Sequence, residues 1–170
     1  MINTIKRFWL RKKFGIRPSN IFSRFIYNEV KKVAIIAEEG DTDFKKAQSF
    51  LGVLNFKNSQ ATFFSFVQEN ASNIESSKSH IFCSKKSFSC FFGIPTDVEL
   101  TNFIKTDFDL LIDLSEGNKY TDMAVEFSHA RLRIGNIQMD KKHLYDMMFD
   151  MGEEGIAHEV KKYLKIINLS

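Results

Sequence analysis

The sequence predicts an α/β fold: a three-layer, mostly parallel Rossmann-like sheet with a basic helical N-terminal extension. Short, mainly apolar runs at 33–37 and 108–113 are typical of strands that are buried on both faces. A segment with apolar residues at helical spacing, 43–54, follows the first of these runs. Strands that alternate with helices along the chain indicate parallel strands joined by helical crossovers.

The length of 170 residues suits one globular body, and 44% hydrophobic residues with 18 Phe can form a substantial core. We expect the basic extension at 1–32 and the Rossmann-like domain at 33–170. No run approaches the roughly 18–20 apolar residues that a membrane span needs, and two cysteines make no disulfide framework. We therefore expect a cytoplasmic protein without a transmembrane segment, able to lie at the membrane periphery.

The net charge of +3 conceals an uneven distribution. Residues 1–32 contain nine basic side chains and a single acid, Glu29, which gives a net charge of +8. Residues 33–170 contain fifteen basic and twenty acidic side chains, a net charge of −5. A basic head on an acidic body concerns binding partners rather than the fold.

Two helices are predicted before the sheet begins. In residues 2–14 the apolar residues Ile2, Ile5, Phe8 and Trp9 recur at helical spacing. Pro18 breaks this helix, and Ser19 suits the N-cap of a second helix that runs to Val30. We expect the second helix to pack on the body and the first to be held more loosely.

The other elements follow from the same patterns. The sequence Thr96-Asp97-Val98-Glu99 is a capping box, which predicts a helix with Thr96 as its cap. Further helices are predicted at 122–130 and at the C-terminal end, where the helix starts at Glu153-Glu154 and runs through Ile167. Further strands are predicted at 61–67, 80–83, 88–92, 131–134 and 145–151.

Two segments, DLLIDLSEGNKYTDMAVEFSHARLRIG at 109–135 and YDMMFDMG with EVKKYLKIIN after it, resemble a family of small uncharacterised bacterial proteins with a Rossmann-like body. The resemblance covers most of the chain, and the family supplies no known activity. A strand ending in Asp, a helix and then Ala-x-x-x-x-Gly, together with Gly40-Asp41, also give a faint similarity to the N-terminal half of heptosyltransferase-like glycosyltransferases. This second similarity implies a shared fold rather than an activity.

Open α/β sheets bind ligands beyond the carboxyl ends of their strands, where the strand order reverses. If 33–37 and 108–113 are neighbours, the polar residues that follow them meet at that edge. Asp41 and Asp113 can then hold a metal ion or move a proton, provided that the two carboxylates meet. Alternatively, these residues are ordinary caps and turns. The candidate ligand-binding residues are Glu38, Gly40, Asp41, Thr42, Asp113 and Ser115.

Other chemistries lack their signatures. No GxGxxG or GxxxxGK[ST] loop occurs, and the turn after 33–37 presents acids that would repel phosphate. No GxSxG elbow occurs, and Ser128 and His129 are adjacent, so that their side chains diverge on a helix. We predict no catalytic residue, no metal and no cofactor.

His80, Cys83 and Cys90 raise the question of zinc. A two-residue turn at Lys86-Ser87 would place the two cysteines opposite each other and His80 on the other face. Two sulfurs without further ligands indicate reduced, buried cysteines. A zinc site and a regulatory disulfide are the alternatives.

The basic head is the strongest functional feature of the sequence. Its helix carries aromatic side chains beside cations, so it can lie on an anionic membrane, grip RNA phosphates or dock on an acidic protein. A solvated helix end is the alternative interpretation. The sequence therefore favours a non-catalytic binding protein, and a small transferase or hydrolase with an unidentified ligand at the carboxyl edge is the alternative. The predicted partner-binding residues are Lys6, Arg7, Trp9, Arg11, Lys12 and Lys13.

Overall fold

The computed structural model describes residues 8, 10–15, 25–37, 41–67, 79–89, 94–150 and 155–167, without the side chains of residues 41 and 42. Within these residues, six strands form one sheet in the order β3-β2-β1-β4-β5-β6, and every pairing is parallel. This confirms the predicted fold class. The strands are β1 (Val33–Ala37), β2 (Ala61–Phe66), β3 (His80–Cys83), β4 (Leu110–Asp113), β5 (Leu132–Asn136) and β6 (Met147–Phe149).

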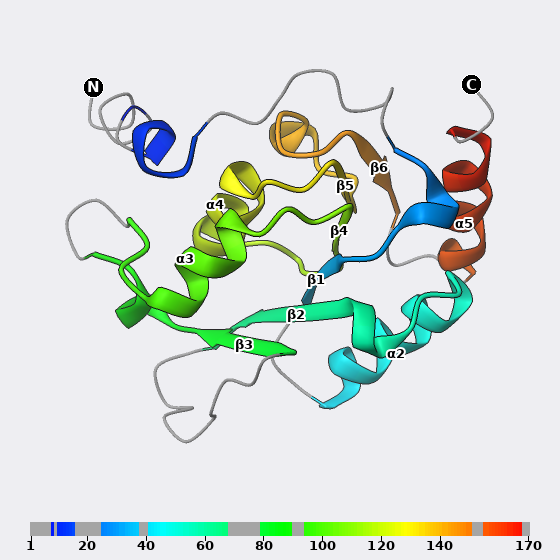
Figure 1. Ribbon diagram of the computed structural model, residues 1–170, viewed down its shortest axis with the longest axis horizontal. Coiled ribbons are helices and arrows are strands. Elements are labelled where there is room, and N and C mark those ends of the chain that lie inside the picture. The colour runs from blue at the N-terminus through cyan, green and yellow to red at the C-terminus, as the bar shows by residue number, and fades with distance from the viewer. Residues whose placement is uncertain are drawn as a thin grey trace.

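Helices cover both faces of the sheet and make three layers (Figure 1). On one face lie α2 (Asp41–Val53) and α5 (Ile156–Ile167), and on the other lie α3 (Val98–Lys105) and α4 (Lys119–Phe127). Each face has its own cluster of buried apolar side chains. None of the helices in the described part of the chain is long and apolar enough to span a membrane.

The two central strands are β1 and β4, which lie side by side and run in the same direction. Ile36 is the register partner of Asp113, and every residue of both strands is buried. Helical layers on both faces explain why these strands are apolar throughout instead of alternating with polar residues.

Of the described residues before β1, those at 10–14 pack on one face of the body and those at 25–30 on the other. Leu10 and Phe14 are 1% and 3% exposed and belong to the cluster beneath α3 and α4. Residues 10–14 are helical, and the expectation that they are loosely held is wrong. Phe8, by contrast, is 64% exposed.

The second predicted helix does not extend through 25–30. These residues form a single 3₁₀ turn at Tyr27–Glu29. Tertiary contacts override the helical spacing there, because the Tyr27 hydroxyl donates to the Leu54 carbonyl and the Gln60 side chain donates to the Val30 carbonyl. Residues 16–24 lie outside the described residues.

Four local predictions are also corrected. Asp97, and not Thr96, caps α3, since its carboxylate accepts from the Glu99 and Leu100 amides at 2.8 and 3.0 Å. The helix predicted at 122–130 begins at Lys119, where the preceding asparagine caps it. A 3₁₀ turn at 85–87 replaces the predicted two-residue hairpin turn, and the described part of the predicted strand 88–92 makes one antiparallel bridge, between Phe88 and Pro95.

Candidate functional site

The strand order reverses between β1 and β4. The connection from β1 carries α2 over one face, whereas the connection from β4 carries α4 over the other. The two connections therefore diverge beyond Ala37 and Leu114, and a cavity of about 430 Å³ opens there between α2 and α5. This position, outside the carboxyl ends of the strands at the reversal, is where open α/β sheets bind ligands.

We call this cavity the carboxyl-edge cleft; it combines apolar surface with polar groups at its more exposed side. Lys46 lies 3.3 Å from the Asp43 carboxylate, and the two side chains are 72% and 36% exposed. An ion pair this exposed contributes little to stability, so a ligand can rearrange it at small cost. The apolar lining is Ala37, Phe50, Val53, Leu114, Ile156 and Ala157, and the polar side chains are Asp43, Lys46, Ser49 and His158.

Asp113, the last residue of β4, is 1% exposed and fully engaged by hydrogen bonds. One carboxylate oxygen accepts from the Ser115 amide at 2.9 Å and from the Ser115 hydroxyl at 2.6 Å, and the other accepts from the Tyr145 hydroxyl at 2.8 Å. Burial raises the pKa of Asp113, and these hydrogen bonds only partly offset that effect. The buried carboxylate therefore organises the structure around it.

Tyr145 reaches Asp113 because Gly135 lies beneath its ring. A Cβ atom at Gly135 would overlap the Tyr145 ring, so a larger residue there would push the ring away. Tyr145 packs against the apolar cluster on the α3 and α4 side of the sheet. Asp113 faces the same side, because it stands two residues after Leu111, a member of that cluster.

A second glycine accommodates a neighbouring ion pair. Lys141 lies 2.9 Å from the Asp122 carboxylate, and both side chains are largely buried. Gly117 has a φ of +81°, and a Cβ atom there would overlap the Lys141 ammonium group. The absence of a side chain at Gly117 thus permits both the positive φ of the turn before α4 and the position of Lys141 in the ion pair.

The described members of the predicted ligand site do not share one face of the sheet. Asp113 and Ser115 are bonded to each other on the face that α3 and α4 cover, whereas α2, which begins at Asp41, covers the opposite face. Tyr145, which fell inside a predicted strand, and the polar residues of the cleft were not identified from the sequence. Glu38 and Gly40, and the side chains of Asp41 and Thr42, lie outside the described residues.

The described part of the basic extension, residues 8 and 10–15, is called the basic segment below, and it is anchored on the body by its own apolar and backbone groups. Phe14 packs on Phe127 with ring centroids 6.3 Å apart, and its carbonyl lies 2.5 Å from Nε2 of His129. Lys13 donates to the Pro95 carbonyl at 2.6 Å. Arg11 and Lys12 are exposed, whereas Lys6, Arg7 and Trp9 lie outside the described residues.

His80 and Cys83 are packing residues. The His80 ring stacks on Phe44 and Phe82, and its Nε2 lies 3.1 Å from the Ser65 hydroxyl. Burial lowers the pKa of His80 and raises that of the Cys83 thiol to about 12, so both are neutral at pH 7. No group of metal-binding side chains occurs among the described residues, and Cys90 is not one of them.

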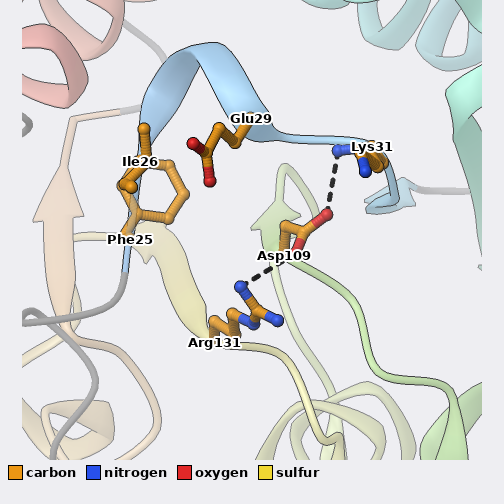
Figure 2. A pocket seen from close by; sticks show the side chains of 6 residues that line it. All are labelled: Phe25, Ile26, Glu29, Lys31, Asp109 and Arg131. Carbon is orange, nitrogen blue, oxygen red and sulfur yellow. Dashed lines mark hydrogen bonds and ion pairs between the residues drawn. The ribbon is translucent and has the colours of Figure 1, made fainter.

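A second cavity, of about 510 Å³, lies at the amino-terminal edge of the sheet (Figure 2). Its walls come from the segment before β1 and from the residues that precede β4 and β5. Asp109 accepts from the Lys31 and Lys32 amides at 2.8 and 3.1 Å and lies 3.5 Å from Arg131. We call this cavity the amino-edge pocket, and its lining residues are Phe25, Ile26, Glu29, Lys31, Asp109 and Arg131.

Comparison with known proteins gives one match. The sequence profile of a protein family matches residues 6–167, and that family is described as one of unknown function. No curated protein and no solved structure matches the chain. The similarity to heptosyltransferase-like glycosyltransferases therefore has no support from a homologue, and the function has to be argued from the geometry.

Proposed function

We propose that this chain, which belongs to the family of unknown function DUF6913, is a binding protein that holds a small polar molecule in the carboxyl-edge cleft. The observation that carries the proposal is the position of the cleft, between Ala37 and Leu114 at the reversal of strand order. Among open α/β sheets this is the general ligand position. The alternative is that the bound molecule is a substrate and that the chain is a small transferase or hydrolase.

The charges around the cleft favour a neutral or cationic ligand. Asp43 and Lys46 pair with each other at the cleft, so the net charge comes from the chain segment between β1 and α2, which contributes Glu38 and Glu39 in sequence. A nucleotide would need bare amides for its phosphates, and no glycine-rich phosphate loop is present in the sequence. We include Glu38, Gly40, Asp41 and Thr42 in the proposed site on the strength of their place in the sequence.

Blocking the cleft tests the proposal. Ser49 is exposed and lines the cleft, so Ser49→Trp fills it without disturbing the core. Ser59→Trp is the matched control, because Ser59 is also exposed but precedes β2, away from the cleft. Thermal-shift titrations would use neutral sugars and polyamines, with ATP and NAD as anionic comparators. We expect a neutral or cationic compound to stabilise the wild type and Ser59→Trp but not Ser49→Trp; equal shifts in all three, or no shift, would contradict the proposal.

A second candidate function is docking through the basic segment, as a cytoplasmic protein that meets an acidic protein, RNA or an anionic membrane surface. The observation that favours it is that Leu10 and Phe14 fix the segment on the body while Arg11 and Lys12 stay exposed. The buried pair is not available for insertion into lipid. We therefore infer a partner that is recognised by charge.

Charge reversal tests this docking better than truncation, since truncation would remove buried Leu10 and Phe14. Arg11→Glu with Lys12→Glu should abolish binding to poly-glutamate, single-stranded RNA or phosphatidylserine vesicles, whichever the wild type retains at physiological salt. Lys162→Glu with Lys165→Glu, at exposed positions of α5, is the matched control. Equal loss in both double variants would show a general charge effect and would contradict docking through the segment.

A further inference from the structure

We propose that the amino-edge pocket binds a small zwitterion with an apolar side chain, the chemical class of a free apolar amino acid. Arg131 receives the carboxylate, Glu29 receives the ammonium group, and Phe25 and Ile26 contact the side chain. Figure 2 shows these groups converging on one cavity from the segment before β1 and from the start of β5. This site is separate from the carboxyl-edge cleft, which lies at the opposite end of the strands.

Arg131 supplies a positive group at the pocket, where it is paired with Asp109. Asp109 is 18% exposed at its side chain, and one of its oxygens is fixed by the amides of Lys31 and Lys32. Its other oxygen lies 3.5 Å from Nη1 of Arg131. A guanidinium carries five N–H donors in a planar fork, which matches the two oxygens of a carboxylate. Arg131 can therefore bind a carboxylate while Asp109 orients it.

The negative group comes from the other wall. Glu29 ends the 3₁₀ turn before β1, and its carboxylate points into the same cavity as Arg131 (Figure 2). Asp109 adds a second negative charge to the lining. Lys31 and Arg131 line the same cavity, so its two carboxylates are matched by two cations and the lining has no net charge. Such a lining favours a ligand that carries one positive and one negative group over an inorganic phosphate, a nucleotide or a simple cation. A zwitterion can place its carboxylate at Arg131 and its ammonium group at Glu29.

The apolar wall specifies the remainder of the ligand. Phe25 is 4% exposed and closes the cavity from the left of Figure 2, next to Ile26. Ile26 is 43% exposed, a large apolar side chain left open to solvent at the pocket. Covering it with a ligand side chain is favourable, because apolar surface is removed from water.

Two variants and three ligands test the assignment together. L-leucine, leucinamide, which lacks the carboxylate, and N-acetyl-leucine, which lacks the ammonium group, are titrated by calorimetry. The wild type should bind L-leucine at least about tenfold more tightly than either analogue, since each analogue lacks one of the two charged groups that the pocket binds. Glu29→Gln should remove the preference over N-acetyl-leucine alone, and Arg131→Gln the preference over leucinamide alone.

Matched substitutions separate the pocket from general charge effects. Glu159→Gln and Lys105→Gln remove exposed charges elsewhere and should leave all three affinities unchanged. Ser49→Trp should also bind L-leucine normally, so that failure of the carboxyl-edge proposal and failure of this one are distinct results. The proposal is overturned if L-leucine, L-methionine and L-phenylalanine all fail to bind saturably, or if neither pocket variant changes the preference between the analogues.

Discussion

At the scale of single residues, a buried carboxylate and a glycine determine how the carboxyl end of β4 is held. Asp113 accepts three hydrogen bonds, and the one from Tyr145 comes from a residue 32 positions later in the chain. Gly135 makes room for the Tyr145 ring. A buried carboxylate without these donors would carry a large desolvation cost. Gly135 leaves room for the Tyr145 ring, and the Tyr145 hydroxyl supplies one of the donors that offset this cost.

Gly135→Ala should therefore destabilise the protein. The added methyl group overlaps the Tyr145 ring, and overpacking of this kind costs about 1–3 kcal/mol. Gly52→Ala is the control: no atom lies within 4 Å of a Cβ there, and alanine in a helix is favoured by about 0.5–1 kcal/mol. Urea denaturation should show opposite shifts, and a Gly135→Ala protein as stable as the wild type would contradict the packing argument.

Asp113→Asn should change the pH dependence of stability. Burial raises the folded-state pKa of Asp113 above its usual value of 3.8, so the folded state keeps this proton at pH values where the unfolded chain has lost it. Asp113 therefore adds to the free energy of unfolding at pH values below its pKa in the unfolded chain. This stabilisation is lost as pH rises through its pKa in the folded state. Asparagine has no such titration.

The measurement is the free energy of unfolding of both proteins between about pH 3 and pH 8. The stability of Asp113→Asn relative to the wild type should rise with pH and level off above the folded pKa. A relative stability that is constant with pH, or that falls as pH rises, would contradict the raised pKa.

At the scale of elements, the segment at 10–14 is part of the core on the α3 and α4 side. Its apolar side chains enter that cluster, while the helix ends at Gly15 with a φ of +86°. The sequence pattern predicted this helix from residues 2–9, and it did not identify Leu10 and Phe14 as the buried face. Which face of a short helix packs is set by the surface it meets, and periodicity alone does not contain that information.

Phe14→Ala should cost about 3–5 kcal/mol of stability, the range for deleting a buried phenylalanine side chain. Phe8→Ala is the matched control in the same segment, because Phe8 is 64% exposed and a surface change costs about 0.5 kcal/mol or less. Thermal denaturation of the two variants distinguishes an anchored segment from a loosely held one. Equal, small effects would show that the segment contributes nothing to the core.

The boundaries of elements were predicted less well than their existence. Thr96 and Asp97 both have capping side chains, and only the geometry of the turn decides that Asp97 accepts from the helix amides. Residues 25–30 have helical spacing, but hydrogen bonds from Tyr27 and Gln60 to carbonyl groups hold them in another conformation. Such contacts between distant segments cannot be read from a local pattern.

At the scale of the whole molecule, the fold followed from the sequence because strand burial leaves a strong signal. The apolar residues of β1 and β4 indicated two central parallel strands, and their pairing confirms it. The position of the cleft followed in part, since the reversal point lies between those strands. Its polar residues did not, because Asp43 and Ser49 belong to α2 and His158 to α5, segments more than 100 residues apart in the chain.

The most direct test of the carboxyl-edge cleft is a small-molecule fragment screen read by backbone amide chemical shifts. We expect shift changes to concentrate at Ala37, in the first turns of α2 and around His158, and Ser49→Trp to remove them. Shift changes confined to other surfaces, or fragments that bind equally well to Ser49→Trp, would contradict it.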